Sequence, residues 1–168
     1  MILNRQRRIS IAIKPLADFC QRVRRELQFP EEGVTICLVN DPAMARLNRT
    51  FRGKHGSTDV LSFPALPGES KRASGESSFG SGPGSGLVSG RRHRRNGISD
   101  GDAYRGDIAI SLETAQRNAR RSSRSLAAEL RILILHGMIH LAGYDHESDQ
   151  GQMNKFERRL RRRFGLGV

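Results

Sequence analysis

The sequence predicts an α/β fold, close to α+β, in which a small mixed four-stranded sheet is packed with about five helices. Two observations predict this class. Short runs rich in β-branched residues alternate with longer segments of helical periodicity, and one of those segments is apolar nearly all round, as a central helix would be. A length of 168 residues suits one domain, so residues 1–168 are expected to form a single unit.

The first part of the chain predicts a strand and a helix. Residues 7–13 alternate β-branched side chains with smaller or polar ones, which is typical of a strand. Pro15 then stands where a first helical turn would begin. The apolar residues that follow recur at helical spacing and predict an amphipathic helix: Leu16, Phe19, Cys20, Val23 and Leu27.

A buried strand and a second helix come next. Residues 34–39 are apolar on nearly every position, as expected of a central strand that is covered on both faces. Asp41 can cap a helix whose first turn contains Pro42. The predicted buried stripe of this helix consists of Met44, Leu47 and Phe51.

The third strand precedes an abrupt change in composition. Residues 60–64 form a short apolar run closed by Pro64, which suits an edge strand or a strand end. Residues 67–102 are mostly Gly, Ser and Arg, with a basic run at 91–95. Such a segment cannot bury enough apolar surface to offset the entropy of ordering. We therefore expect a disordered insertion within the domain, at about residues 67–102, whose ends emerge close together.

The second half of the chain predicts one strand and three helices. Residues 106–111 predict the strand, and a helix follows from about residue 113 to residue 121. Ser125 can cap the central, largely apolar helix, which Gly143 can end in the left-handed conformation. A last helix, at about residues 149–163, ends in a dense basic stretch. Its expected buried residues are Met153, Phe156 and Leu160.

Charge and composition restrict the setting and the partners. The formal net charge is +12, from 29 Lys and Arg against 17 Asp and Glu, which favours a polyanionic partner. Charge alone does not choose between RNA, DNA and an acidic membrane, and it can also serve solubility. No run reaches the roughly 18 apolar residues of a membrane span. Cys20 and Cys37 lie in apolar segments, which favours core packing over a disulfide and a reducing, cytoplasmic setting.

Three histidines near the end of the central helix predict a metal site. His136 and His140 are four residues apart, so they share one helix face and can direct their imidazoles at a common point. Gly143 lets the chain turn, and His146 can then supply a third ligand. Three imidazoles would leave the fourth tetrahedral position of one Zn²⁺ ion open to water, which is the catalytic pattern. Zinc can lower the pKa of that water to about 7.

The same spacing occurs in zinc peptidases, but one residue differs. Gly137 stands where those enzymes place the glutamate that acts as general base. This absence argues against ordinary peptide hydrolysis, although another zinc-dependent hydrolase remains an alternative. A closed structural zinc would need a fourth ligand, and Asp145, Cys20 and Cys37 are poor candidates for it.

The polar loop before the third strand contains a second cluster of candidate functional residues. Arg52 and Lys54 could hold phosphate, or they could be ordinary solvated charges in a turn. Asp59 could accept a hydrogen bond from a ligand imidazole, or it could simply order the loop.

These motifs together resemble the YbeY family of ribosomal-RNA maturation endoribonucleases. The resemblance rests on residues 51–54, 58–64 and 106–108 and on the histidine block at 136–146. It implies a zinc-dependent, single-strand-specific endoribonuclease that acts in small-subunit rRNA 3′-end maturation and ribosome quality control. It also implies that the three histidines hold zinc and that Arg52 is the family's functional arginine.

The resemblance further implies single-stranded RNA, rRNA and the ribosome or its small subunit as partners, in the cytoplasm and without a membrane partner. A non-enzymatic ribosome-assembly factor with a structural zinc remains the second alternative. The chain departs from the family pattern in two places. His55, Gly56 and Ser57 replace the family's usual acid and proline, and the insertion is longer than usual.

Overall fold

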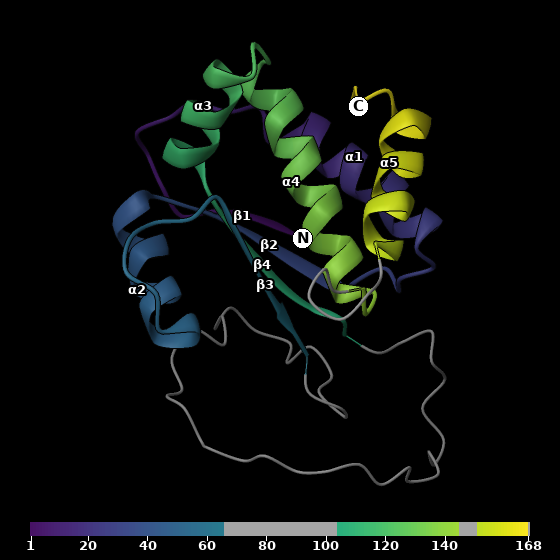
Figure 1. Cartoon of the computed structure of the whole chain (residues 1–168), viewed down its shortest axis with the longest axis horizontal. Coiled ribbons are helices and arrows are strands. Elements are labelled where there is room, and N and C mark those ends of the chain that lie inside the picture. The colour runs from purple at the N-terminus through teal and green to yellow at the C-terminus, as the bar shows by residue number, and fades with distance from the viewer. Residues whose placement is uncertain (66–103, 145–150, 168) are drawn as a thin grey trace, which may run out of the picture.

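The computed structural model describes residues 1–65, 104–144 and 151–167 (Figure 1). The predicted insertion at 67–102 and the predicted ligand His146 lie outside these ranges. No helix in the described ranges is long and apolar enough to cross a membrane.

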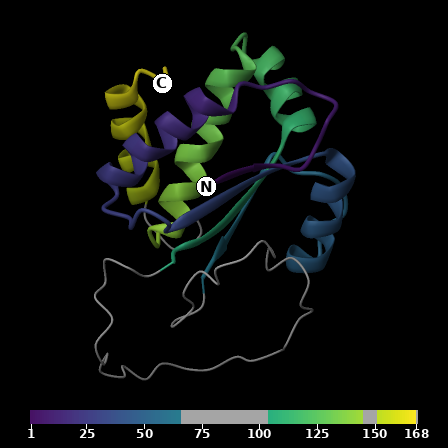
Figure 2. The same cartoon turned by 180° about the vertical axis from the view of Figure 1, so that it is seen from behind.

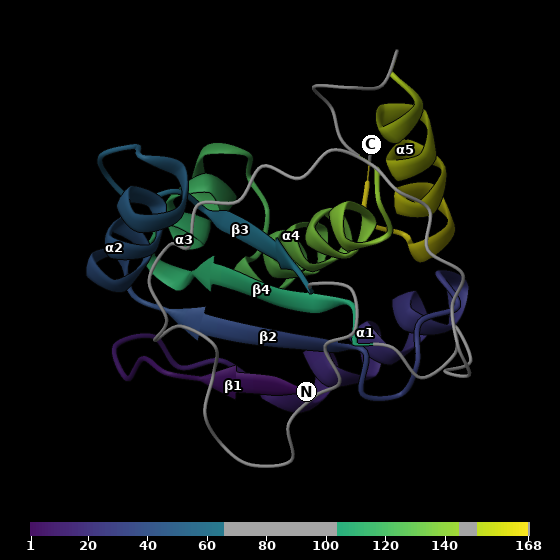
Figure 3. The same ribbon diagram turned by 90° about the horizontal axis from the view of Figure 1, so that it is seen from below.

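Four strands form one mixed sheet. They are β1 (Ile2–Asn4), β2 (Val34–Val39), β3 (Val60–Pro64) and β4 (Gly106–Ser111). Their order is β1-β2-β4-β3, with β1, β2 and β4 mutually parallel and β3 antiparallel to β4 (Figure 3). Every residue of β2 and β4 is buried, as expected for inner strands covered on both faces. The sheet confirms the predicted class and the edge position of residues 60–64.

Five helices cover the two faces of this sheet within the described residues. They are α1 (Ile13–Glu26), α2 (Asp41–Arg52), α3 (Leu112–Arg121), α4 (Leu126–Leu141) and α5 (Gln152–Phe164). Alternate residues of β2 point to opposite faces, since strand side chains have a period of two. Ile36 and Leu38 join the larger core with α1, α4 and α5, whereas Cys37 packs with Met44 of α2. Helix α2 therefore covers the face opposite the other helices (Figure 2).

Helix α4 runs through the middle of the larger core, as its apolar sequence predicts. The Ser125 hydroxyl caps the helix by accepting a hydrogen bond from the backbone N–H of Ala128 at 3.1 Å. Beyond the last helical residue, Gly143 takes a positive φ of 92°. Its N–H donates to the carbonyl of His140, so the chain turns away where the sequence predicts.

The residues on either side of the predicted insertion lie next to each other. The N–H of Ala65 donates to the carbonyl of Arg105 at 3.0 Å, which extends the antiparallel pairing of β3 and β4. Ala65 and Arg105, the described residues that flank the predicted insertion, therefore lie side by side at one end of β3 and β4.

The predicted strand at residues 7–13 is wrong. Strand β1 is the shorter segment Ile2–Asn4, and α1 already begins at Ile13. The buried side chain of Gln6 makes the hydrogen bonds to this backbone that a neighbouring strand would otherwise make. Its Oε1 accepts from the N–H groups of Arg8 and Ile9, and its Nε2 donates to the carbonyl of Ile9. The apolar alternation reflects packing of Ile9 and Ile11 against the core.

Three details of the other helices also differ from prediction. Asn40 rather than Asp41 caps α2, because the Asn40 side chain accepts from the N–H of Ala43 at 2.9 Å. Phe51 is 47% exposed and touches Phe63 of β3 edge-on instead of lying in the core. The last helix begins at Gln152, after Gly151, rather than at about residue 149.

Candidate metal centre

Two of the three predicted ligands meet one turn apart near the end of α4. The Nε2 atoms of His136 and His140 lie 3.2 Å apart, and the two rings stand nearly perpendicular, at 82°. Both side chains are partly buried. The helical spacing therefore brings two imidazole nitrogens to one point, as the sequence predicts.

The other nitrogen of each ring faces an acceptor. The Nδ1 atom of His136 lies 3.0 Å from Oε2 of Glu157, and the Nδ1 atom of His140 lies 3.1 Å from the carbonyl oxygen of Tyr144. A carboxylate and a carbonyl only accept, so each imidazole carries its proton on Nδ1. The lone pairs of the two Nε2 atoms then point toward the same place, which is the tautomer that a metal ion requires.

The spacing of these nitrogens fits a tetrahedral metal ion. Two nitrogens at about 2.0 to 2.1 Å from zinc, with a tetrahedral angle between them, lie about 3.3 to 3.4 Å apart. The observed Nε2 to Nε2 distance is 3.2 Å. No group of three His, Cys, Asp or Glu side chains within the described ranges is placed to hold a metal, and the third predicted ligand, His146, falls outside them.

Glu157 is a candidate site residue that could not be identified from the motifs, since it contacts His136 from another helix. It lies on α5 and is only 6% exposed, between the core residues Met153 and Leu160. Its other oxygen, Oε1, accepts hydrogen bonds from Arg161. Burial raises the pKa of this carboxyl, but the hydrogen bond from His136 and the charge and hydrogen bonds of Arg161 outweigh burial and lower it. A charged residue on the core-facing stripe of a helix is the signal that could have identified it.

The glycine beside the first histidine faces the sheet. A Cβ atom on Gly137 would lie 3.0 Å from two methyl carbons of Ile108 and 3.2 Å from the Ser62 hydroxyl. The Ser62 hydroxyl also donates to the Gly137 carbonyl at 3.4 Å. Helix α4 therefore approaches β3 and β4 closely here. A glutamate at this position would enter the packed interface instead of reaching the two imidazoles.

Arg52 is the last residue of α2, and its side chain is exposed. Within the described ranges, no hydrogen bond or ion pair joins it to His136 or His140. The two parts nevertheless flank the same strand. Phe51 contacts Phe63 of β3, and Gly137 contacts the adjacent Ser62. Helices α2 and α4 also run in the same sense along the sheet, so their C-terminal ends lie toward the same end of the sheet (Figures 1 and 2).

The loop between α2 and β3 is held by two aspartates. Asp59 accepts from the N–H of Val60 at 2.9 Å and from the Asn118 amide at 3.1 Å. It therefore orders the loop, one of its two predicted roles, and forms no hydrogen bond with the ring of His136 or His140 in the described ranges. Lys54 is exposed in the same loop.

Asp41, the second of these aspartates, accepts hydrogen bonds from several side chains. Its Oδ1 accepts from the hydroxyls of Ser57, Ser111 and Thr114, and its Oδ2 accepts from Arg117 at 2.7 Å. Burial raises the pKa of the Asp41 carboxyl, but these donors together bring it well below its usual range. Asp41 thus ties the loop to β4 and α3, a role that the sequence analysis did not predict.

The fold and the histidine pair define an α/β protein with a polar centre at the end of its central helix, and comparison with known proteins assigns the family. Residues 1–165 match the family described as Endoribonuclease YbeY. The chain is 35% identical over 166 residues to the Endoribonuclease YbeY of Koribacter versatilis, covering 99% of this chain and 86% of the relative. It is 38% identical to the protein of that name from Moorella thermoacetica, covering 82% and 75% of the two chains.

The chain therefore belongs to the YbeY endoribonuclease family, as its motifs indicate. A solved structure supports the fold independently. The solution structure of a Thermotoga maritima protein is similar with a TM-score of 0.55, at 23% identity, over 98% of this chain and 90% of that one.

Proposed function

We propose that this chain is a metal-dependent endoribonuclease that hydrolyses phosphodiester bonds in single-stranded RNA. One Zn²⁺ ion would be held by His136, His140 and His146, with a water molecule as the fourth ligand. The observation that carries the proposal is the convergence of two Nε2 atoms at 3.2 Å with both Nδ1 atoms turned to acceptors. Family membership selects RNA as the substrate class.

When bound, a zinc ion supplies a Lewis acid that polarises a phosphoryl oxygen and acidifies water. The protein's own residues prepare the site for it. Glu157 and the Tyr144 carbonyl hold the two imidazoles in the tautomer that leaves Nε2 as an acceptor. Arg52 neutralises the negative charge that develops on the phosphoryl group. Its side chain is exposed and therefore free to bind phosphate, and its neighbour Phe51 contacts the edge strand β3.

We further propose that the RNA is ribosomal, with a role in small-subunit rRNA 3′-end maturation and ribosome quality control in the cytoplasm. The net charge of +12 supports a polyanionic partner, because each neutralised phosphate releases condensed counterions. The proposed partner is accordingly the ribosome or its small subunit, which contains this RNA.

Cleavage of labelled RNA before and after metal removal tests this function. Protein treated with a chelator is expected to lose cleavage of a single-stranded oligonucleotide and to regain it when zinc is added. A duplex of the same sequence is expected to be cut much more slowly. Equal cleavage by the stripped and the reloaded protein would contradict the proposal.

Two alternatives make different predictions. A zinc peptidase would digest a peptide library in a zinc-dependent way, and the absence of its glutamate at the tightly packed Gly137 disfavours it. An assembly factor with a structural zinc would unfold when His140 is replaced by alanine. The enzyme is expected to stay folded and become inactive, because catalytic zinc sites sit on preformed scaffolds.

A further inference from the structure

Most of the cationic residues of helix α5 form no ion pair with an acidic residue in the described ranges. Its sequence contains six cationic residues and one acid: Lys155, Arg158, Arg159, Arg161, Arg162 and Arg163 against Glu157. Arg161 pairs with Glu157, and Arg163 pairs with Glu26 of α1. Among the described residues, no acidic side chain forms an ion pair with any of the other four.

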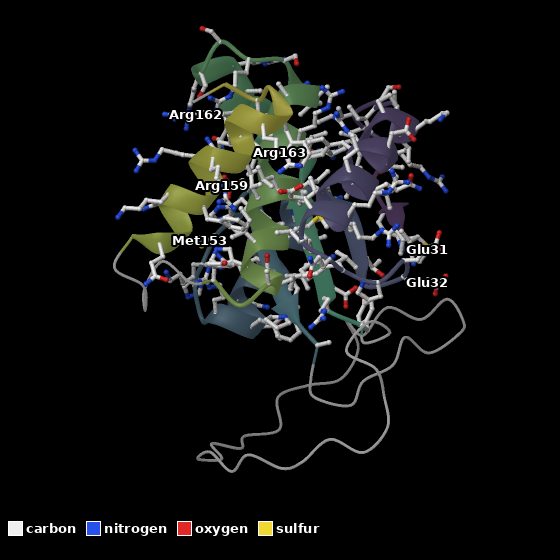
Figure 4. All side chains as sticks on the ribbon, turned by 90° about the vertical axis from the view of Figure 1, so that its right-hand side faces the viewer. Glu31, Glu32, Met153, Arg159, Arg162 and Arg163 are labelled. Carbon is white, nitrogen blue, oxygen red and sulfur yellow. The ribbon has the colours of Figure 1, made fainter. Side chains whose placement is uncertain are left out.

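These four residues form one exposed stripe, which we call the α5 stripe: Lys155, Arg158, Arg159 and Arg162. They follow one another at intervals of three, one and three residues, so they share one helix face. All four are exposed, and Figure 4 shows Arg162 on the side of α5 away from α1, with Arg163 toward α1. Seven residues of helix place about 10 Å between the first and the last Cα atom.

The stripe borders the candidate metal centre. Glu157, which bonds His136, lies on the same helix, and Arg158 lines a surface hollow of about 390 Å³ together with Glu157. On the other side, the Tyr144 ring stacks on Phe156 at 4.9 Å, and the Arg159 guanidinium lies 5.0 Å from the centre of the Phe156 ring. The Tyr144 carbonyl accepts from His140. A chain of contacts through Tyr144 and Phe156 therefore links His140 to Arg159 of the stripe.

The chemistry of this surface fits a nucleic-acid backbone. Guanidinium groups bind phosphate oxygens through two parallel hydrogen bonds, and successive arginines on one helix face can contact successive phosphates. An anionic membrane fits less well, because a helix that binds in a membrane interface also presents apolar side chains to it. In the described ranges, the exposed large hydrophobic residues are Met1 and Phe51, neither of them on α5.

We propose that the α5 stripe is the docking track for the phosphate backbone of the single-stranded RNA whose scissile bond lies at the histidine pair. The inference rests on the proposed function for the identity of the strand. It adds that RNA affinity and cleavage are separable, since no stripe residue forms a hydrogen bond or ion pair with His136 or His140 in the described part of the chain.

The test compares two double variants of the full chain. The first, Arg158→Gln with Arg162→Gln, removes two charges from the stripe and leaves the stacked Arg159 in place. The control, Arg120→Gln with Arg121→Gln, removes two exposed charges from the last turn of α3. Binding of a fluorescent single-stranded RNA is followed by anisotropy at several salt concentrations, in chelator so that binding is measured without cleavage. Circular dichroism checks that both variants fold.

The stripe variant is expected to bind roughly 10-fold more weakly, with the slope of log K against log salt reduced by about 1.4, or 0.7 for each lost phosphate contact. The control is expected to change affinity by less than about 2-fold. Equal losses in both variants, or no loss in either, would overturn the inference. So would a stripe variant that loses binding to phosphatidylglycerol vesicles but not to RNA.

A second readout separates this inference from the proposed function. If His140→Ala abolishes cleavage and still binds RNA in a stripe-dependent way, both proposals are supported. If the wild-type protein does not cut RNA but the stripe variant loses RNA affinity, the RNA-binding role of the stripe stands, whereas the proposed nuclease function and the placement of a scissile bond at the histidine pair fail.

Discussion

At the scale of single residues, the histidine pair depends on a neighbour from another helix. Glu157 fixes the tautomer of His136 from α5, 21 positions further along the chain. Its own place is fixed by burial and by the ion pair with Arg161. A carboxylate behind a ligand imidazole also raises the basicity of the nitrogen that faces the metal.

Glu157→Gln is therefore expected to weaken zinc binding about 10-fold to 100-fold, because the neutral amide still accepts from Nδ1 but no longer polarises the ring. Competition with a chromophoric chelator measures the affinity. Glu26→Gln is the matched control, since Glu26 also pairs with an arginine but lies on α1 and makes no described contact with the histidines. Equal affinities for the two variants would contradict the positioning role.

Gly137→Glu tests the packing argument for the missing general base. The substitution adds a side chain where even a Cβ meets Ile108 at 3.0 Å, and it brings a carboxylate into an apolar interface. We expect a loss of more than about 3 kcal/mol in the free energy of unfolding, measured with urea, because overpacking and an unpaired buried charge both act. A stable Gly137→Glu protein would show that the position can reach the site after all.

The histidine pair could be predicted from sequence because a spacing of four is a property of any helix. Glu157 could not be paired with His136 in the same way. That contact depends on how α5 packs on α4, which local spacing does not specify. The sequence nonetheless shows a glutamate between Met153 and Leu160, which were both predicted to be buried.

At the scale of elements, the loop that follows Arg52 is anchored to α3 through Asp41. Three hydroxyls and one guanidinium converge on this carboxylate. The pKa of Asp41 is lowered in the folded protein, so the carboxylate stabilises the fold at a pH above the ordinary aspartate value of about 4. That contribution is lost as the pH falls below 4 toward the lowered pKa of the folded state.

Asp41→Asn is expected to cost about 1 to 3 kcal/mol at pH 7, because hydrogen bonds to a charged group are replaced by weaker ones. The difference from wild type should shrink as the pH falls from 5 toward 2. Urea unfolding at several pH values measures both quantities. Asp18→Asn serves as the control, since Asp18 forms an exposed pair with Lys14 that is worth under about 1 kcal/mol. A pH-independent cost at Asp41 would contradict the account.

The strands and helices with a strong local sequence pattern were predicted correctly, and strand β1, whose pattern is weak, was not. The inner strands and the central helix are nearly continuous apolar runs, and their bounds match closely. Strand β1 has three residues, too few to show a recurring pattern, and among the described strands it pairs with β2 alone. The apolar alternation just after it suggested a strand, but Gln6 bonds the backbone there instead.

At the scale of the whole molecule, the two cysteines report on the integrity of the fold. Cys37 is buried beneath α2 and Cys20 is partly buried on α1. Burial raises the pKa of the Cys37 thiol to about 11 and that of Cys20 to about 12. Both thiols therefore stay protonated and shielded near neutral pH, in agreement with the predicted packing role.

Alkylation with iodoacetamide at pH 8 is expected to label neither thiol in the native protein and both in urea. The thiolate is the reactive form, and folding suppresses both its population and its access. Mass spectrometry of the labelled chain measures the extent at each site. Rapid native labelling of either cysteine would show that the core opens without global unfolding.

The central claim for the whole molecule is that His136 and His140 are preset to hold a metal ion for RNA hydrolysis. Equilibrium zinc titration of the wild type and of His140→Ala tests it most directly, with circular dichroism confirming that both are folded. The account predicts one zinc ion per wild-type chain and an affinity at least about 100-fold lower for the variant, because one of the two converging nitrogens is lost. A wild-type chain that binds no zinc, or a variant that binds it equally well, would contradict the claim.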